Sequence, residues 1–119
     1  MQNKRSLGTE KELLAVEYLK EQGVKVLESN FYFRGGELDL IVKDGEYLCF
    51  VEVKYRKSSS YGLPEEAVTI SKQRKIIQGA KLYLYRNKYP LDTPCRFDVI
   101  SIFRNEITWI KDAFSNAGW

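Results

Sequence analysis

One short stretch of the sequence, residues 36–54 (GELDLIVKDGEYLCFVEVK), contains three carboxylates and a lysine whose types and spacing could bind a metal ion. They form two pairs, Glu37 with Asp39 and Glu52 with Lys54. Carboxylates among so many apolar residues are costly to bury unless they are paired or bind a metal ion. Carboxylate oxygens, together with water, are also the ligands that Mg²⁺ prefers. The stretch is therefore a candidate metal site.

A β-hairpin would bring the two pairs together. The apolar runs on either side of Asp44-Gly45 predict two strands joined by a two-residue turn at that dipeptide. In this register Glu37 lies opposite Glu52, and Asp39 lies opposite Phe50. Because side chains alternate along a strand, the acids and the lysine are predicted on one face. Asp39 and Glu52 would be diagonal neighbours with Cβ atoms roughly 7–8 Å apart, which suits a shared cation. A bulged three-residue turn would change this parity.

The opposite face of the hairpin is predicted to be entirely apolar and to include Leu38, Leu40 and Val42. Strands this apolar are typical of the interior of a sheet. The alternative for the acidic face is a solvated ion pair between Lys54 and either Glu52 or Asp39. Three acids against one lysine leave an excess of negative charge, and that excess favours a bound cation.

The spacing of these residues resembles that of a known group of enzymes. Asp39, twelve intervening residues and then Glu52-Val53-Lys54 resemble the catalytic core of the PD-(D/E)XK nuclease superfamily. The wider strings GGELDLI and FVEVKYR resemble, more narrowly, the YraN family of small bacterial proteins, whose fold is similar to that of archaeal Holliday-junction resolvases. Leu38 stands where the superfamily's name has proline, which members often lack. The resemblance covers nearly the whole chain.

The resemblance implies an endonuclease that depends on Mg²⁺ or Mn²⁺ and hydrolyses phosphodiester bonds in DNA, with branched or structured DNA as the expected substrate. Asp39 and Glu52 are expected to hold the metal. Lys54 is expected to orient or deprotonate the attacking water, or to stabilise the charge of the transition state. Glu12 aligns with a helical site glutamate of the family and is expected to join the metal site, with Glu37 completing its outer shell. Resolvase-like folds often dimerise to cut two strands, so a homodimer is a further expectation.

The composition narrows the classes of function. A chain of 119 residues predicts one domain that spans residues 1–119. The absence of histidine excludes a Ser-His-Asp triad, a histidine general base and a histidine-ligated zinc. No apolar run approaches the ~20 residues needed to cross a membrane, and the N-terminus lacks the apolar segment of a signal peptide. Cys49 and Cys95 lie far apart without metal-binding spacing, so we expect reduced thiols in a cytoplasmic protein.

The remaining pattern predicts a mixed α/β domain with a restriction-endonuclease-like fold, in which helices flank a central sheet in the order α-β-β-β-α-β-β. A first helix is predicted from Gly8 or Thr9 to just before Gly23. A second is predicted from an N-cap at Ser71 to about Asn87. The strands are predicted at residues 25–33, 38–42, 47–53, 95–103 and 106–110.

Glu12 lies in the middle of the apolar stripe of the first helix, in line with Ala15, Val16 and Leu19. An acid in this position has two interpretations. It could be a rim glutamate paired with a nearby lysine, or it could be a third carboxylate that faces the hairpin site.

A group of basic residues follows the hairpin and continues on the second helix: Arg56, Lys57, Lys72, Arg74 and Lys75. Together with nearby tyrosines they are predicted to follow DNA phosphates and stack on bases, the alternative being an ordinary solvated helix face. The resemblance implies a place near the metal for Gln73, whereas Asp98 is expected to have a structural role with Arg96 or the backbone. Two other functions remain open: a non-catalytic nucleic-acid-binding module and a protein-interaction module on the same fold.

Overall fold

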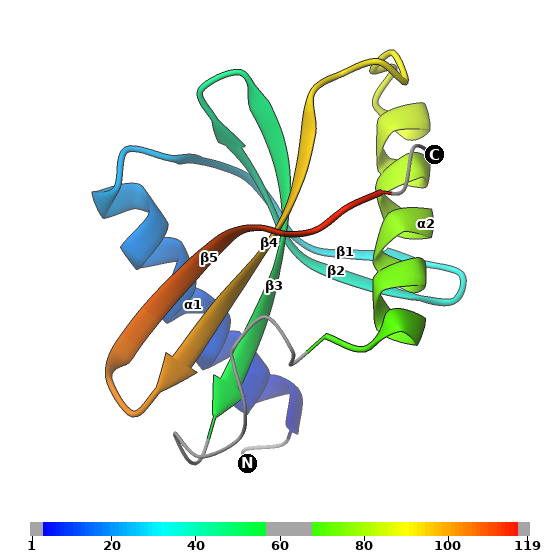
Figure 1. Ribbon diagram of the computed structural model, residues 1–119. Helices are drawn as coiled ribbons and strands as arrows, with labels where there is room; N and C mark the ends of the chain where they lie inside the picture. The colour runs from blue at the N-terminus through cyan, green and yellow to red at the C-terminus, as the bar shows by residue number, and fades with distance from the viewer. Residues whose placement is uncertain (1–3, 57–67, 117–119) are drawn as a thin grey trace.

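The structure, a computed structural model, describes residues 4–56 and 68–116. Its elements follow the predicted order α-β-β-β-α-β-β and are labelled in Figure 1. They are α1 (Lys4–Glu21), β1 (Lys25–Phe33), β2 (Gly36–Asp44), β3 (Tyr47–Arg56), α2 (Ile70–Arg86), β4 (Cys95–Phe103) and β5 (Glu106–Phe114). The predicted mixed α/β fold is confirmed, and it is compatible with a restriction-endonuclease-like fold. Within the described ranges, no helix has the length and hydrophobicity to cross a membrane.

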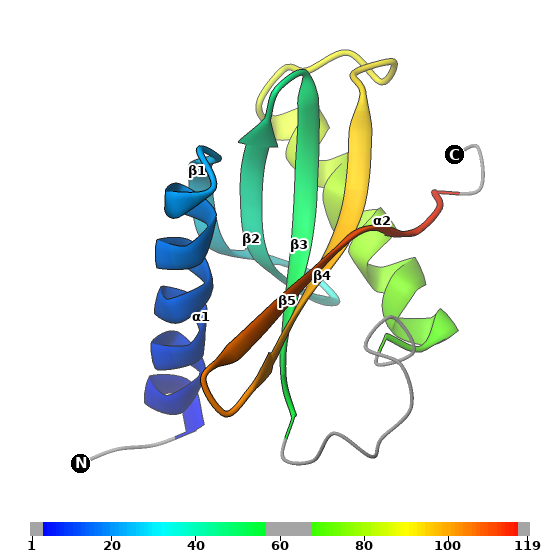
Figure 2. The ribbon, with the colours of Figure 1, turned by 60° about the vertical axis from the view of Figure 1, so that its left-hand side comes forward.

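The five strands form one mixed sheet in the order β1-β2-β3-β4-β5. Three of the neighbouring pairs are antiparallel, whereas β3 and β4 are parallel. Parallel strands need a crossover connection, and here α2 lies in the connection between β3 and β4. The two helices lie on opposite sides of the sheet (Figures 1 and 2).

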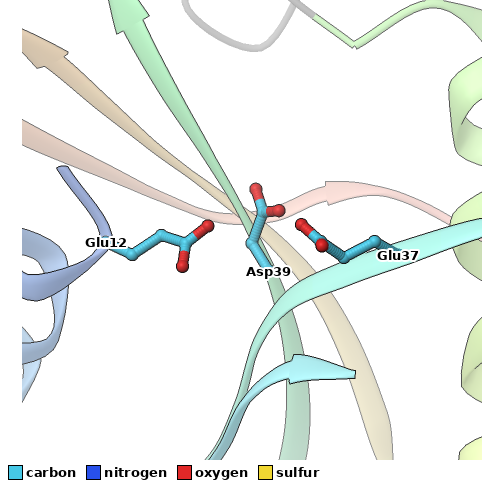
Figure 3. Close-up of side chains that lie close together, drawn as sticks. All are labelled: Glu12, Glu37 and Asp39. Carbon is cyan, nitrogen blue, oxygen red and sulfur yellow. The ribbon is translucent and has the colours of Figure 1, made fainter. Parts of the chain in front are cut away.

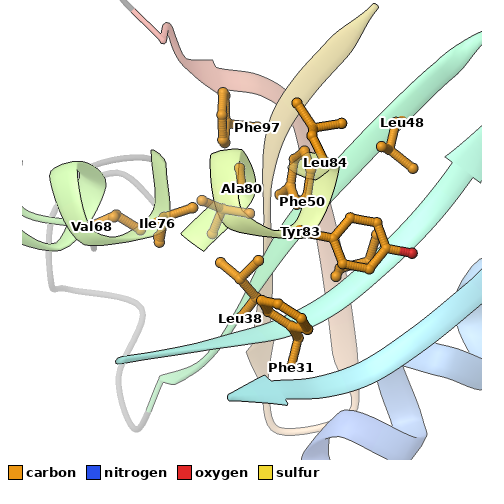
Figure 4. Packing of buried hydrophobic residues seen from close by; sticks show 12 residues of the cluster. Phe31, Leu38, Leu48, Phe50, Val68, Ile76, Ala80, Tyr83, Leu84 and Phe97 are labelled. Atoms are coloured by element: carbon orange, nitrogen blue, oxygen red, sulfur yellow. The ribbon is translucent and has the colours of Figure 1, made fainter. Parts of the chain in front are cut away.

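Each helix covers its own hydrophobic cluster. On the α1 side, Ala15 and Leu19 pack with Leu40, Val42 and other strand residues. The α2 side is rich in aromatic rings, which Figure 4 shows around α2: Phe31, Phe50, Tyr83 and Phe97, packed with aliphatic residues. Burial of these two faces stabilises the layered arrangement, because apolar surface is removed from water on both sides of the sheet.

Gly79 of α2 allows the helix to approach the β1–β2 end of the sheet closely. A Cβ atom at this position would lie 2.5 Å from the Phe33 ring and 3.1 Å from Leu38. Real Cβ contacts are longer than this, so the absence of a side chain at Gly79 makes room for Phe33 at the end of β1.

The predicted hairpin register is wrong, because the turn lies one residue later in the chain than predicted. Asp44 pairs with Tyr47, so the two loop residues are Gly45 and Glu46, and Gly45 takes the left-handed conformation with φ 60°. Phe50 therefore lies opposite Ile41 rather than Asp39. The physical reason is that Asp44 stays in the strand, where its carboxylate accepts a hydrogen bond from Arg96 Nη2 at 2.8 Å.

The predicted all-apolar face of β2 is also wrong at one residue. Leu40 and Val42 belong to the α1 cluster, but Leu38 belongs to the α2 cluster. The two-residue alternation is therefore broken around Asp39, between Leu38 and Leu40. This break puts Asp39 where residues of β2 change from one side of the sheet to the other.

Several element boundaries differ from the predictions, and β2 and β3 are longer than the predicted 38–42 and 47–53. The first helix begins at Lys4 rather than Gly8 or Thr9, because one glycine near a helix end is a small cost. The N-cap of α2 is Thr69 rather than Ser71, and its Oγ1 accepts a hydrogen bond from the backbone N–H of Lys72 at 3.1 Å. The last strand continues to Phe114, whose ring stacks on Phe97 with centroids 5.1 Å apart.

Candidate metal centre

Three carboxylates gather where α1 faces β2. Glu12 points out of α1, and Glu37 and Asp39 point toward it from β2, as Figure 3 shows. One oxygen from each of the three side chains lies within 4.8 Å of the others, and all three side chains are half-buried. The helix and strand therefore bring Glu12 to two acids that lie 25 and 27 residues after it in the sequence.

Asp39 is fixed by a hydrogen bond to the neighbouring strand. Its Oδ2 accepts from the backbone N–H of Val53 at 2.9 Å. The regular pairing of β2 with β3 extends from the turn to the pair Leu40–Val51 and does not include Asp39, the neighbour of Leu40. The Asp39 side chain thus binds the backbone of β3 just beyond the end of the regular pairing.

Glu52 of β3 lies beside Asp39 of β2 and is 5% exposed. It pairs with two lysines, Lys72 Nζ at 3.5 Å and Lys54 Nζ at 3.9 Å. Burial raises its pKa, while the two lysines and a hydrogen bond shared with Asp39 act in the opposite direction. Glu52 therefore lies next to the three-carboxylate group, with its charge facing Lys54 and Lys72.

Negative charge exceeds positive charge around Asp39. Burial, followed by repulsion from Glu52, raises the pKa of Asp39 to about 8, although the Val53 hydrogen bond opposes this shift. Burial also raises the pKa of Glu12, with a smaller contribution from the charges of Glu37 and Glu52. An additional cation would relieve this repulsion.

The carboxylate group fits a Mg²⁺ or Mn²⁺ ion in its chemistry and its size. Opposite ligands of an octahedral Mg²⁺ ion are about 4 Å apart, because each Mg–O distance is about 2.0–2.1 Å. Adjacent ligands lie closer still, so the three oxygens, now within 4.8 Å of one another, would approach by side-chain rotation when an ion binds. Asp39, Glu12 and Glu37 supply the hard oxygen ligands that such ions prefer.

The predicted basic residues are placed differently from one another. Lys72, in the first turn of α2, reaches Glu52, and its side chain remains 39% exposed. Arg74 and Lys75 are exposed on the same part of α2, and Arg56 is half-buried at the end of β3. Lys57 lies outside the described residues. The structure therefore joins the start of the basic helix to the acidic site through Lys72.

Gln73 and Asp98 have clear local partners. Gln73 Nε2 donates to the Val68 carbonyl at 3.0 Å, which ties the side chain to the segment before α2. Asp98 is fully buried and accepts hydrogen bonds from Arg96 Nε and from the backbone N–H of Asp112, both at 2.9 Å. The predicted structural role of Asp98 is confirmed by these contacts.

Two contacts near the acids were not predicted from the sequence. The Asn30 side chain of β1 interacts with Glu12 and lowers the pKa of its carboxyl. Lys11 Nζ lies over the Tyr55 ring, 4.1 Å from its centroid, and so links α1 to β3. The available signal for Asn30 was its type, because asparagine is uncommon in strands.

Known proteins resemble this chain over most of its length. Residues 11–102 match the family model described as "Uncharacterised protein family UPF0102". A UPF0102 protein of Lachnoclostridium phytofermentans is 49% identical over 98% of this chain and 98% of its own. One of Saccharophagus degradans is 44% identical over 91% and 92%, respectively. The UPF0102 protein YraN of Escherichia fergusonii is 43% identical over 94% of this chain and 86% of its own.

A looser likeness exists to a solved structure. The crystal structure of SSO0001 is 19% identical with a TM-score of 0.43, and the match covers 96% of this chain and 55% of that one. So loose a likeness carries no argument about fold or function. The relatives in sequence are decisive, and they confirm the predicted YraN resemblance. The chain therefore belongs to the UPF0102 family, which includes the YraN proteins of Escherichia.

Proposed function

We propose that this protein is a Mg²⁺- or Mn²⁺-dependent endonuclease that hydrolyses phosphodiester bonds in DNA, with branched or structured DNA as its substrate. The observation that carries the proposal is the meeting of Glu12, Glu37 and Asp39 within 4.8 Å of one another. Glu52 and Lys54 stand beside this group on β3. The resemblance of Asp39 and Glu52-Val53-Lys54 to the PD-(D/E)XK core supports the same assignment.

Each side chain has a role that its position supports. Asp39, Glu12 and Glu37 would hold the divalent ion, with Glu52 next to Asp39 as a further ligand. When bound, the ion would polarise a phosphate oxygen and lower the pKa of a water molecule. Lys54, partly exposed and 3.9 Å from Glu52, can orient that water or stabilise charge on the phosphate.

The basic residues support a polyanionic substrate. Lys72 lies 3.5 Å from Glu52, and the exposed Arg74 and Lys75 follow it on α2. A DNA backbone reaching the acidic site could pass along this surface, where each contacted phosphate releases counterions. Arg56, half-buried at the end of β3, is a further basic residue of the proposal, and Lys57 follows it outside the described residues.

Assembly and location are part of the proposal. Two copies would allow one cut in each of two DNA strands, so we propose a homodimer on branched substrates. We also propose a cytoplasmic location. Cys49 and Cys95 are free thiols whose pKa values burial raises, to about 12 and about 11, which makes them weak nucleophiles.

The direct test is cleavage by the purified protein of labelled four-way, flapped and linear DNA, with Mn²⁺ or with a chelator. We expect Mn²⁺-dependent cleavage that Asp39→Asn and Glu52→Gln each lower by at least about 100-fold, because each removes a charge that holds the ion. Asp92→Asn, a change of an exposed acid, is the matched control. Full activity of Asp39→Asn would refute the mechanism.

A second measurement separates the nuclease from its rivals. Neutralising Lys72, Arg74 and Lys75 together should weaken DNA binding and lower its salt slope by about 0.9 per lost phosphate contact. Salt-dependent binding without cleavage would indicate a non-catalytic nucleic-acid-binding module. An unchanged salt slope would remove this helix surface from DNA binding and favour a protein-interaction module.

A further inference from the structure

Asn30 occupies a special position in β1. The ladder pairs Ser29 with Leu40 and Phe31 with Leu38, so Asn30 lies opposite Asp39, at the point where β2 changes sides. The pairing of β1 with β2 also shifts by one residue shortly before, between Val26 and Glu28. Asn30 is therefore next to the acidic group through its backbone position alone.

The backbone of Asn30 has left-handed geometry, with φ 58°. Most residues avoid this region because Cβ approaches the following carbonyl, and asparagine is among the few that tolerate it. Within a strand such a conformation costs free energy and persists where the surroundings require it. At this residue it accompanies a side chain that is directed toward α1.

The Asn30 side chain faces Glu12, and its interaction with the Glu12 carboxylate lowers the pKa of Glu12, against the larger effect of burial. The two side chains also line a small cavity of about 40 Å³, together with Leu13, Val16 and Ser29. A glutamate is long and flexible, and repulsion from Glu37 and Asp39 would favour its rotation away from them. The interaction with Asn30 opposes that rotation.

A neutral donor suits this task better than a charged one. A lysine at position 30 would also orient Glu12, but its charge would compete with a metal ion for the carboxylates. An amide holds one oxygen of Glu12 and leaves the negative charge of the group intact. Partners of this kind commonly fix the orientation of metal-binding carboxylates.

We infer that Asn30 is a positioning residue of the metal site, which holds the Glu12 carboxylate toward Glu37 and Asp39. This inference rests on the metal site of the proposed function. It assigns to β1 a part in that site, alongside α1, β2 and β3.

The test is the affinity of the protein for Mn²⁺ in the absence of DNA, measured by isothermal titration calorimetry. Asn30→Gly removes the donor and suits φ 58°, so the variant should fold. We expect its Mn²⁺ affinity to fall about 10- to 100-fold. Lys88→Gly is the matched control: it removes an exposed side chain at φ 60°, beyond the far end of α2, and should bind Mn²⁺ as the wild type does.

A double-mutant cycle shows whether Asn30 acts through Glu12. In a Glu12→Gln background, Asn30→Gly should change Mn²⁺ affinity less than about twofold, because the carboxylate that it orients is already gone. Equal losses in both backgrounds would overturn the inference.

The outcomes distinguish this inference from the proposed function. Wild-type protein that binds no Mn²⁺ would refute the metal site itself. Wild-type protein that binds Mn²⁺ with the same affinity as Asn30→Gly would refute the role of Asn30 and leave the proposed function standing.

Discussion

Two aspartates in the same sheet, the buried Asp98 and the half-buried Asp39, have opposite surroundings. Asp98 of β4 is fully buried and accepts hydrogen bonds from Arg96, from Trp109 Nε1 at 3.0 Å and from the backbone of Asp112. Asp39 of β2 accepts a hydrogen bond from Val53 but faces other carboxylates. The fold itself supplies the counter-charge of Asp98, whereas Asp39 has an excess of negative neighbours.

The difference separates an acid that stabilises the fold from an acid that the fold tolerates. A buried charge needs a paired charge and several hydrogen bonds to offset its desolvation. Arg96 meets that need for Asp98, and it also joins Asp44 at 2.8 Å. At Asp39 burial, followed by repulsion from Glu52, raises the pKa to about 8. Such unbalanced sites are typical of ligand binding and catalysis.

The comparison predicts its largest effect at Asp98. Asp98→Asn should lower the free energy of unfolding by about 3–5 kcal/mol, because it removes the buried charge that pairs with Arg96 and turns amide hydrogens toward other donors. Urea unfolding followed by circular dichroism measures this change. Asp39→Asn should cost no stability in the apoprotein, since it removes repulsion. Equal losses for the two variants would abolish the distinction between the two sites.

A bound cation should sharpen the contrast. Mn²⁺ at 100 times its dissociation constant should stabilise the wild-type protein by about 2.7 kcal/mol, because it binds the folded state. Asp98→Asn should retain this gain, whereas Asp39→Asn should lose most of it. Thermal melting with Mn²⁺ and with a chelator measures both. A metal-induced gain that persists in Asp39→Asn would place the ion elsewhere.

The third effect concerns pH. The pKa of Asp39 is raised in the folded state, so between about pH 4 and pH 8 the folded protein holds more protons than the unfolded chain. Its stability should therefore fall as pH rises through this window. Asp44 acts in the opposite sense: its hydrogen bond with Arg96 lowers its pKa, so its contribution to folding stability is lost as pH falls.

Unfolding of metal-free wild-type protein and of Asp39→Asn, from pH 5 to pH 9, checks this sign. As pH rises, the free energy of unfolding of the wild-type protein should fall relative to that of the variant. Parallel curves would mean that the Asp39 carboxyl is ionised throughout and that the acidic group is less strained than its geometry indicates.

The sequence was sufficient for most of the fold. The strands 25–33 and 95–103 were predicted with their observed bounds, because turn-forming residues flank them. The hairpin turn was misplaced, since the strand end is extended by the Asp44–Arg96 pair, whose partners are 52 residues apart. Local patterns contain no information on such a contact. The side of Leu38 was missed for a similar reason, because a strand period assumes unbroken alternation.

The site was predictable in its residues more than in its arrangement. Glu12 was singled out by its place in an apolar stripe, and it does lie within 4.8 Å of Asp39 and Glu37. The contact between Lys72 and Glu52 depends on the crossover through α2, which no local pattern specifies. Asn30 was missed because its importance depends on a left-handed backbone and on its distance to α1, both of which are tertiary properties.

The space left by Gly79 has a consequence for genetics. Phe33 fills that space at the end of β1, three residues before Gly36 and four before Glu37, and Gly36 is itself close to the same ring. Any side chain at position 79 would push Phe33, and with it the turn that leads into the acidic strand. A screen for inactive variants should therefore recover position 79 as often as an acidic position, although Gly79 has no chemical group to contribute.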